Sequence, residues 1–366
     1  MATTHLSFQG TVDEIRRSLE GAPQPFETHI PDDFTTLTLT VDGLGSLTES
    51  LTEFTQEAEL PGGCEHPHTG ERTQATQRRR FLALPDVLVL HLKRFQVDGQ
   101  RRSTRRINTR LDFPEDLNMT PYMIADGSET RYILQGVVVH EGTVHHGHYW
   151  SWVRNQGQWR LYNDTTARDS PNLPDNVFDG GAYLLLYERS SRLRPRAISR
   201  RGLKNPGRVC CYANSIVQQM VNIPGFYELV ADQASAGWKR QLCDLMDGLT
   251  SESSPSSDPE DPEGLITAWN HSHRGNWLQQ SDAAEFAMLL ITALEGRIPD
   301  SEGAPEAGAA PGHLRRRGHD GGHQEEVEQV EDDSETTSVS DSAGSPAPKR
   351  QKKRTCASIS NIPAVS

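Results

Sequence analysis

The spacing of hydrophobic residues divides the chain into two halves. In residues 1–190, short runs of β-branched and aromatic residues alternate with Gly, Asp and Asn, a pattern typical of strands. The runs are TTLTLTV, VLVLHLKRF, YILQGVVVH, HYWSWV, QWRLY and AYLLLYER. In the same half, SLTESLTEFTQEAEL places Leu47, Leu51 and Phe54 at helical spacing, which predicts one short amphipathic helix.

The pattern changes at Cys211. From this residue on, hydrophobic residues recur on one helical face, and DAAEFAMLLITALE repeats the same spacing. The residues of the first face are Tyr212, Ile216, Val217, Met220 and Val221. Between the two periodic segments, TSESSPSSDPEDPEG predicts a solvated loop. The second half is therefore expected to be helical.

These patterns predict four parts: a sheet-rich part in residues 1–190, a polar and basic linker in 191–200, a helical part in 201–296 and a disordered tail in 297–366. The tail contains no aromatic residue, and Gly, Pro, Glu, Asp and Ser dominate it, so no packed core forms there. Its segment PAPKRQKKR, residues 346–354, is either a nuclear-import cluster or a solvated run of charge.

Composition limits the partners and the compartment. A formal net charge of -13 argues against nucleic acid or an anionic membrane surface as a partner. No segment approaches the roughly 20 apolar residues that span a bilayer, so we expect a soluble intracellular chain, nuclear and/or cytoplasmic. Five cysteines, an odd number with two adjacent, indicate reduced thiols rather than a disulfide framework.

The adjacent pair Cys210 and Cys211 follows GLKNPGRV, where glycine and proline predict a loop directly before the helix. A cysteine at a helix N-terminus gains thiolate character, because unpaired amides and the helix dipole favour negative charge. The pair is therefore a candidate nucleophile. The alternative is that both residues are small hydrophobic groups packed at a helix start.

A candidate base lies in HEGTVHHGHYWSWVRNQGQWRLYNDTTA, residues 140–167. If HYWSWV and QWRLY form a hairpin across RNQG, His148 at its start comes opposite Asn163 and Asp164 at its end. An asparagine side chain can accept the Nδ1 proton of the imidazole and orient the ring, which predicts a Cys, His, Asn triad. The alternative is a loop histidine beside a turn.

Four separate boxes give the chain a resemblance to the ubiquitin-specific proteases, a papain-like family of cysteine peptidases. The boxes are GLKNPGRVCCYANSIVQ, QQSDAAEF, LPDVLVLHLKRF, and GHYWSWV with WRLYND and AYLLLYER. The resemblance covers nearly all of residues 5–296. In the family the cysteine box comes first, whereas here it follows the histidine box, so the chain resembles a circular permutant. The alternative is two fragments of neighbouring copies that work only when two chains exchange halves.

The resemblance implies a papain-like α+β fold, with a helical thumb in residues 201–296 and a β-rich palm and fingers in 5–190. It implies a deubiquitinating cysteine peptidase, which cleaves the isopeptide or peptide bond after the C-terminal glycine of ubiquitin through a thioester. Ubiquitin and ubiquitinated proteins are the implied partners. The implied roles are nucleophile for a cysteine of the pair, general base for His148, ring orientation for Asn163, a supporting polar group for Asp164, and oxyanion donor for Asn205.

The cysteine box carries one residue more than the family pattern between Gly207 and its Cys-Tyr-x-Asn-Ser motif. Counting back from the helix selects Cys211 as the nucleophile, and counting forward from Asn205 selects Cys210. We choose Cys211, because the helix fixes the thiol whereas a loop can absorb an extra residue.

The fingers lack the paired Cys-x-x-Cys knuckles that hold zinc in many family members. Cys64, His66 and His68 crowd one short loop without a partner pair, and the histidines at 145, 146 and 148 fit the peptidase box better than a metal site. We therefore expect neither a metal nor a cofactor.

Two other functions stay open: a ubiquitin-binding pseudoprotease whose extra residue misplaces the thiol or the oxyanion donor, and a peptidase for a ubiquitin-like modifier. The sequence sets neither the substrate protein, the chain linkage nor the oligomeric state.

Overall fold

The computed structural model describes residues 6–22, 24–98, 103–125, 129–143, 146–155, 157–194, 199–235, 237–251, 258–273 and 281–297. All of them belong to one unit, Met1–Pro305. Apart from Arg297, the predicted tail with its basic cluster lies outside the described residues.

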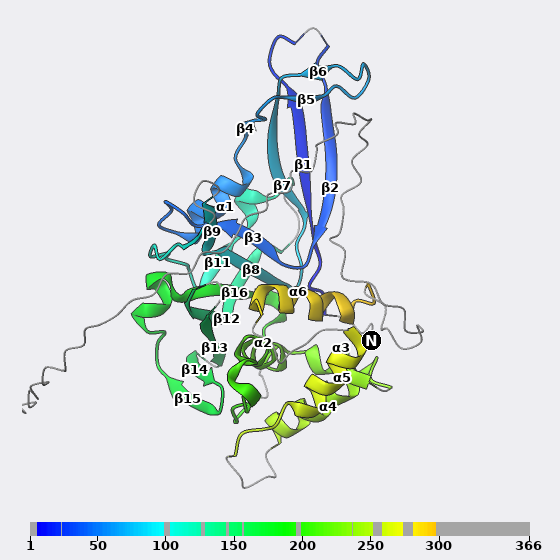
Figure 1. Cartoon of the computed structure of the whole chain (residues 1–366). Coiled ribbons are helices and arrows are strands. Elements are labelled where there is room, and N and C mark those ends of the chain that lie inside the picture. The colour runs from blue at the N-terminus through cyan, green and yellow to red at the C-terminus, as the bar shows by residue number, and fades with distance from the viewer. Residues whose placement is uncertain are drawn as a thin grey trace, which may run out of the picture. The chain divides into compact units, whose positions relative to one another are not determined.

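A narrow antiparallel sheet with the order β2-β1-β7-β4 forms the fingers (Figure 1). Its strands are β1 (Gly10–Ser18), β2 (Glu27–Phe34), β4 (Ala58–Glu59) and β7 (Ala75–Ala83), and a small pair, β5 (Cys64–Glu65) and β6 (Arg72–Thr73), accompanies them. No hydrophobic run marked β1, β2 or β7 in the sequence, because this sheet is rich in charged residues. Across it, Arg79 Nη2 on β7 lies 3.3 Å from Glu14 Oε2 on β1.

The palm is a larger sheet with the order β15-β14-β13-β12-β16-β8-β3, to which β11 adds by pairing with β12. The strands are β3 (Leu37–Thr40), β8 (Val87–Lys93), β11 (Asp116–Asn118), β12 (Arg131–Gly142), β13 (Gly147–Asn155), β14 (Gln158–Asn163), β15 (Thr166–Ser170) and β16 (Ala182–Arg189). All pairs are antiparallel except β3 with β8. A separate hairpin joins β9 (Phe95–Asp98) and β10 (Ser103–Arg106).

The central strands β8 and β16 contain continuous apolar runs, because both faces of the sheet are covered. On β8, Val89 packs into a cluster with the C-terminal helices, while its neighbour Leu90 packs into a second cluster on the other face. On β16, Leu184 and Leu185 divide in the same way. Strands buried on both faces read as continuous hydrophobic runs, which is why VLVLHL and AYLLLY were recognisable in the sequence.

The helices are α1 (Leu47–Thr55), α2 (Cys211–Val221), α3 (Phe226–Ala231), α4 (Gly237–Thr250), α5 (Glu263–His273) and α6 (Ala283–Leu294). Shorter turns are η1 (Thr120–Tyr122), η2 (Val177–Gly181), η3 (Ser190–Arg192) and η4 (Pro206–Arg208). The predicted short helix is α1, and the predicted helical half is α2 to α6. Both expectations are confirmed, as is the α+β fold class.

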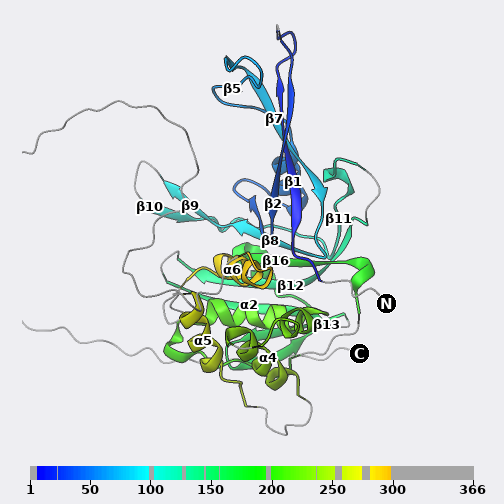
Figure 2. The same ribbon diagram turned by 90° about the vertical axis from the view of Figure 1, so that its right-hand side faces the viewer.

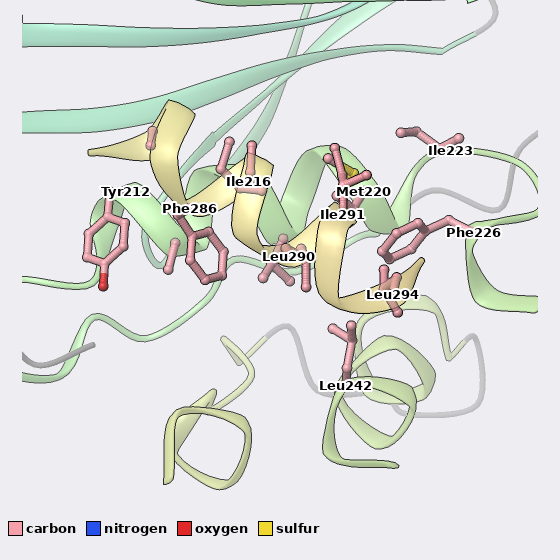
Figure 3. Close-up of a cluster of buried hydrophobic side chains, with 14 of the residues drawn as sticks. Tyr212, Ile216, Met220, Ile223, Phe226, Leu242, Phe286, Leu290, Ile291 and Leu294 are labelled. Atoms are coloured by element: carbon pink, nitrogen blue, oxygen red, sulfur yellow. The ribbon is translucent and has the colours of Figure 1, made fainter. Parts of the chain in front are cut away.

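Helix α2 is the centre of the thumb. It packs against β12, β13 and β14 of the palm and against α3 and α6 of the thumb. Figure 2 shows α2 close to β12, β13 and α6. Figure 3 shows the apolar side chains that α2 shares with α3, α4 and α6. Those labelled are Tyr212, Ile216, Met220, Ile223, Phe226, Leu242, Phe286, Leu290, Ile291 and Leu294. Burial on nearly all sides fixes the helix that begins at Cys211.

The C-terminal end of the predicted linker is packed rather than free. Ser199 is buried, its backbone carbonyl accepts a hydrogen bond from the Tyr162 hydroxyl, and its amide donates to Asn222 Oδ1 at 3.3 Å. The Arg200 amide bonds to the Leu249 carbonyl at 3.2 Å. The chain is thus tied to both the palm and the thumb before the cysteine box begins. Within the described ranges, no helix is long and apolar enough to cross a membrane.

Candidate active site

The two adjacent cysteines lie where the sequence pattern predicted, at the start of α2. Cys211 is the first helical residue and Cys210 is the residue before it. Both side chains are buried, Cys211 with 2% of its surface exposed. The Cys210 side chain makes no capping hydrogen bond to the helix. The nucleophile candidate therefore occupies the first turn of a helix that the core fixes.

His148 is the second residue of β13, and its ring lies between groups from two parts of the chain. Its Nε2 lies 2.7 Å from Asn163 Oδ1 at the end of β14, and the Cys211 thiol is its second side-chain hydrogen-bond partner. The hairpin expected between the two strands runs from Ser151 paired with Tyr162 to Asn155 paired with Gln158. One chain thus brings thiol, imidazole and amide together, despite their order in the sequence.

The prediction of which His148 ring nitrogen faces Asn163 is wrong. We expected Nδ1, but Nε2 makes this contact, which leaves Nδ1 for the thiol. The physical reason is reach. Asn163 belongs to the neighbouring strand, so the nitrogen farther from the His148 backbone spans the gap between the strands.

The electrostatics of the site favour the charged imidazole. The hydrogen bond to Cys211 raises the pKa of His148 to about 9; burial opposes this rise, and Asn163 and the Asp164 carboxylate add to it. The His148 side chain is 41% exposed, so solvent screens part of this effect. An imidazolium beside a thiol is the charge state in which a cysteine is activated as a nucleophile.

Asp164 joins the two halves of the site. Its Oδ2 accepts from Asn205 Nδ2 at 3.0 Å and lies 3.9 Å from His148 Nε2, and its Oδ1 accepts from Asn214 Nδ2 at 3.3 Å. Its backbone carbonyl accepts from the Leu203 amide at 2.8 Å. The residue adopts a left-handed conformation, with φ of 47°. The carboxylate therefore contacts the histidine side and the cysteine side together.

Asn205 lies in the loop before the helix, and its side chain is held at both ends. Its Oδ1 accepts from the Cys210 backbone amide at 2.8 Å, while one N–H of its Nδ2 donates to Asp164. Its assignment as oxyanion donor stays a prediction.

The surroundings distinguish the two thiols. Cys210 Sγ lies 3.7 Å from the Pro206 carbonyl, and burial, with Cys211 and Asp164 nearby, raises the pKa of Cys210 to about 11. A thiol with a raised pKa is a poor nucleophile at neutral pH. The contact with His148 belongs to Cys211. The geometry supports the choice made from the helix register.

The extra residue of the cysteine box lies in a strained turn. Gly207 has φ of 69° and Arg208 has φ of 59°, two successive left-handed residues inside η4. Glycine adopts this conformation freely, but for arginine it costs roughly 1–2 kcal/mol. The extra residue is therefore absorbed before α2 begins.

Two structural residues near the site received no role from the sequence. Asp282 caps α6 through Oδ1, which accepts from the amides of Ala284 and Glu285 at 2.8 and 3.0 Å, and its Oδ2 accepts from the hydroxyl of Tyr183. Asn214 donates to Asp164 and to the Lys204 carbonyl at 3.0 Å. The signal for Asp282 was available, since an Asp directly before AAEF reads as an N-cap.

Among the described residues, no group of three or more His, Cys, Asp or Glu side chains is arranged to hold a metal. His66 in the fingers is buried, and its Nδ1 accepts from the amides of His68 and Thr69, each at 3.2 Å. That nitrogen is thus engaged in fixing a turn. His145 of the second histidine group lies outside the described residues. The expected absence of metal stays a prediction.

A family model described as ubiquitin carboxyl-terminal hydrolase matches residues 8–187 and 201–359. The chain belongs to this family. The matched segments contain both sides of the site, His148 with Asn163 in the first and Cys211 in the second.

As a ubiquitin carboxyl-terminal hydrolase family member, the chain is similar to much longer relatives. It is 32% identical over 194 residues to ubiquitin carboxyl-terminal hydrolase 15 of Schizosaccharomyces pombe, a match to 46% of this chain and 17% of the relative. It is 34% identical over 145 residues to ubiquitin carboxyl-terminal hydrolase 48 of Danio rerio, covering 38% and 14%. The chain thus matches only about a sixth of the length of these curated relatives.

Among solved structures, the chain is similar to the SAGA Ubp8/Sgf11/Sus1/Sgf73 DUB module bound to ubiquitin aldehyde. The identity is 28%, the TM-score is 0.43, and the match covers 50% of this chain and 41% of that chain.

Proposed function

We propose that this protein is a deubiquitinating cysteine peptidase that hydrolyses the isopeptide or peptide bond after the C-terminal glycine of ubiquitin. Cys211 is the nucleophile, His148 the general base and acid, and Asn163 the residue that orients the imidazole. Family membership supports the substrate class. The observation that carries the proposal is the His148 ring between Asn163 Oδ1, at 2.7 Å, and the Cys211 thiol within one chain.

The chemistry follows the usual two steps of a thiol peptidase. The Cys211 thiolate attacks the carbonyl carbon of the terminal glycine, and His148 protonates the departing lysine amine, leaving a thioester. His148 then takes a proton from water, which hydrolyses the thioester and releases ubiquitin. Asn205 is the assigned donor to the oxyanion, a contact often worth about 3 kcal/mol.

The direct test uses a ubiquitin probe that carries an electrophile at its C-terminus. We expect covalent labelling of Cys211 in the wild-type chain and none in Cys211→Ala. The Cys210→Ala variant is the matched control, because it removes the neighbouring thiol, and it should label like the wild type. Labelling that survives Cys211→Ala and disappears in Cys210→Ala would reassign the nucleophile.

A ubiquitin-binding pseudoprotease is the second candidate, and the Asn205 contacts favour it. One N–H of the Asn205 side chain donates to Asp164 and its Oδ1 accepts from the Cys210 amide, which directs the side chain toward these groups at the end of the loop that carries the extra residue. A misplacement of about 1 Å can cost a hundredfold in rate. Reversible binding of ubiquitin without any probe labelling would select this candidate. The same probe built on ubiquitin-like modifiers tests the modifier specificity.

We further propose that one permuted chain forms a complete site, rather than two chains exchanging halves. The contact between His148 and Cys211 in a single chain supports this. Mixing Cys211→Ala with His148→Ala is a sharp test, because exchanged halves would rebuild one intact site from two dead chains. We expect no recovery of hydrolysis on mixing.

We also propose ubiquitin and ubiquitinated proteins as partners, and the nucleus and/or cytoplasm as the location. Imaging the tagged chain with and without residues 346–354 tests whether the basic cluster acts in import. Loss of nuclear signal on deletion is expected if it does, and an unchanged distribution would assign it to a solvated run of charge.

A further inference from the structure

Arg106, at the end of β10, uses all five of its N–H donors on Asn108, on the turn η2 and on the end of β12. Nε donates to Asn108 Oδ1 at 2.7 Å, Nη1 to the Gly142 carbonyl at 2.9 Å, and Nη2 to the His140 carbonyl at 2.6 Å and the Gly180 carbonyl at 3.1 Å. The fifth contact joins Nη1 to His140 Nδ1 at 2.8 Å. A guanidinium has five donors in a fixed planar arrangement, so this geometry fixes the side chain completely.

Two of these contacts bracket the strand position that carries His148. The carbonyls of His140 and Gly142 flank Glu141, and Glu141 is the residue that pairs with His148 across β12 and β13. The next pair is Gly142 with Gly147. Arg106 therefore fixes the end of β12 on both sides of the residue that faces the general base.

A second series of contacts leads from Arg106 through the His140 ring to the strand position of His148. A contact from an arginine N–H requires His140 Nδ1 to be the unprotonated nitrogen, and burial and the charge of Arg106 lower the pKa of His140 to about 4. The ring packs 4.4 Å from the Tyr149 ring, centroid to centroid, and a Cβ on Gly147 would overlap its Nε2. Gly147 and Tyr149 are the two neighbours of His148 in the chain.

We propose that Arg106 is a positioning residue for the reaction: it fixes the end of β12 and the His140 ring, and through them keeps the His148 imidazole in register with Cys211. The inference rests on the proposed function, since it assigns His148 as the base. It differs from a purely structural role, because the predicted loss lies in the chemical step and in the charge state of the Cys211 and His148 pair.

The test compares Arg106→Gln and Arg106→Lys with Arg105→Gln in the full chain. Arg105 is the matched control. It is the preceding residue of the same strand, and its side chain is exposed and bonds only to Asp42 and Gln96 at 2.9 and 3.0 Å among the contacts of the described residues.

The first readout is hydrolysis of a fluorogenic ubiquitin C-terminal amide. We expect Arg106→Gln to lower kcat by roughly 10- to 100-fold with little change in KM. Arg106→Lys should fall between, and Arg105→Gln should match the wild type.

The second readout needs no ubiquitin. Alkylation of Cys211 by iodoacetamide, followed by mass spectrometry across pH, reports the charge state of the thiol beside His148. The groups that act on this imidazole are Cys211, Asn163, Asp164 and, at longer range, His140, and the acidic Glu141 pairs with His148 across the two strands. In Arg106→Gln we expect the onset of Cys211 reactivity to move to higher pH, because an imidazole out of register stabilises the thiolate less. Arg105→Gln should leave the onset unchanged.

The outcomes separate this proposal from the proposed function. In one outcome the wild-type chain does not hydrolyse the ubiquitin amide, but the pH profile of Cys211 alkylation shifts in Arg106→Gln. This result supports the positioning role and rejects the peptidase function. An active wild type with an active Arg106→Gln and an unchanged profile rejects the positioning role alone. If Arg106→Gln loses activity only in proportion to its unfolded fraction, with a normal profile, the role is structural and the proposal is wrong. If Arg106→Gln does not fold, the same two readouts on Arg106→Lys decide.

Discussion

The two sides of the site are built in opposite ways. On the histidine side, His148 lies in a regular ladder in which β13 pairs residue by residue with β12, from Gly136 with Val153 to Gly142 with Gly147. On the cysteine side, the loop from Asn205 to Cys210 contains two successive left-handed residues and is closed mainly by the contacts of the Asn205 side chain and carbonyl.

The difference explains why an extra residue is compatible with an assembled site. The sheet fixes His148 and the buried helix α2 fixes the sulfur of Cys211, so the loop between Asn205 and Cys211 can change length without moving either. Asn205 lies at the far end of that loop, and its side chain is held by hydrogen bonds with Asp164 and the Cys210 amide rather than by a helix or a sheet. Damage from the extra residue should therefore fall on oxyanion stabilisation, before it affects the contact between thiol and imidazole.

The largest expected effect separates the two cysteines. Cys211→Ala removes the thiol that contacts His148 and should lower kcat/KM for ubiquitin amide hydrolysis on the order of 10⁴-fold or more. Cys210→Ala removes a buried thiol with a pKa of about 11 and should leave kcat/KM within a few-fold of wild type. Steady-state kinetics of both variants measure this contrast. The opposite ranking would place the nucleophile in the loop rather than on the helix.

Removing the Asp164 carboxylate, which links the two sides of the site, should lower kcat/KM less than removing the Cys211 thiol. Asp164→Asn retains a residue that tolerates the left-handed backbone but replaces the charged acceptor of Asn205 and Asn214. Hydrogen bonds to charged groups contribute about 1.5–3 kcal/mol, so we expect kcat/KM to fall roughly 10-fold or more. Asp169→Asn is the control, because its exposed carboxylate pairs with Arg160 on the neighbouring strand, away from the thiol. Equal kinetics for the two variants would contradict a linking role for Asp164.

A smaller and more specific effect concerns pH. The pKa of His148 is raised from 6.5 to about 9, so its protonated form stabilises the folded chain fully below pH 6.5, and this contribution is lost as pH rises through 9. Hydrolysis should fall over the same alkaline range, because the leaving amine needs the imidazolium proton.

The hydrogen bond to the Cys211 thiol contributes most to the raised pKa of His148, so Cys211→Ala should return this pKa toward its ordinary range. Imidazole NMR titration of both chains measures this shift. The Cys210→Ala chain is the control and should keep the raised value. A His148 pKa that is the same in Cys211→Ala and wild type would show that the thiol is not its main partner.

The contrast between the paired strands on the histidine side and the irregular loop on the cysteine side also explains which structural features the sequence could predict. The palm strands were recognisable because burial on both faces leaves a continuous apolar run, and the hairpin through RNQG placed His148 near Asn163 from strand pairing alone. The finger strands were missed as individual elements, because charged and polar residues such as Glu14 and Arg79 dominate them, even in β1, where several residues are buried. Hydrophobic periodicity fails where a strand carries few apolar residues.

The details that sequence did not predict depend on contacts between distant segments. The nitrogen of His148 that faces Asn163 depends on the gap between strands, and the partners of Asn205 depend on how the loop absorbs its extra residue. Arg106 is the clearest case. Its five donors reach Asn108, His140, Gly142 and Gly180, up to 74 residues away, and no local motif encodes that set.

The smallest expected effect tests the strained loop itself. Arg208→Gly removes the Cβ from a residue at φ of 59°, which relieves roughly 1–2 kcal/mol of strain and is partly offset by the greater entropy of glycine in the unfolded chain. We expect the free energy of unfolding to rise by about 0.5–1 kcal/mol, seen as a higher urea midpoint at unchanged slope. Arg208→Ala is the matched control, because it removes the guanidinium but keeps the Cβ, and it should give no such gain. If both variants stabilise equally, the charge of Arg208 rather than its backbone is responsible, and the loop is not strained by its extra residue.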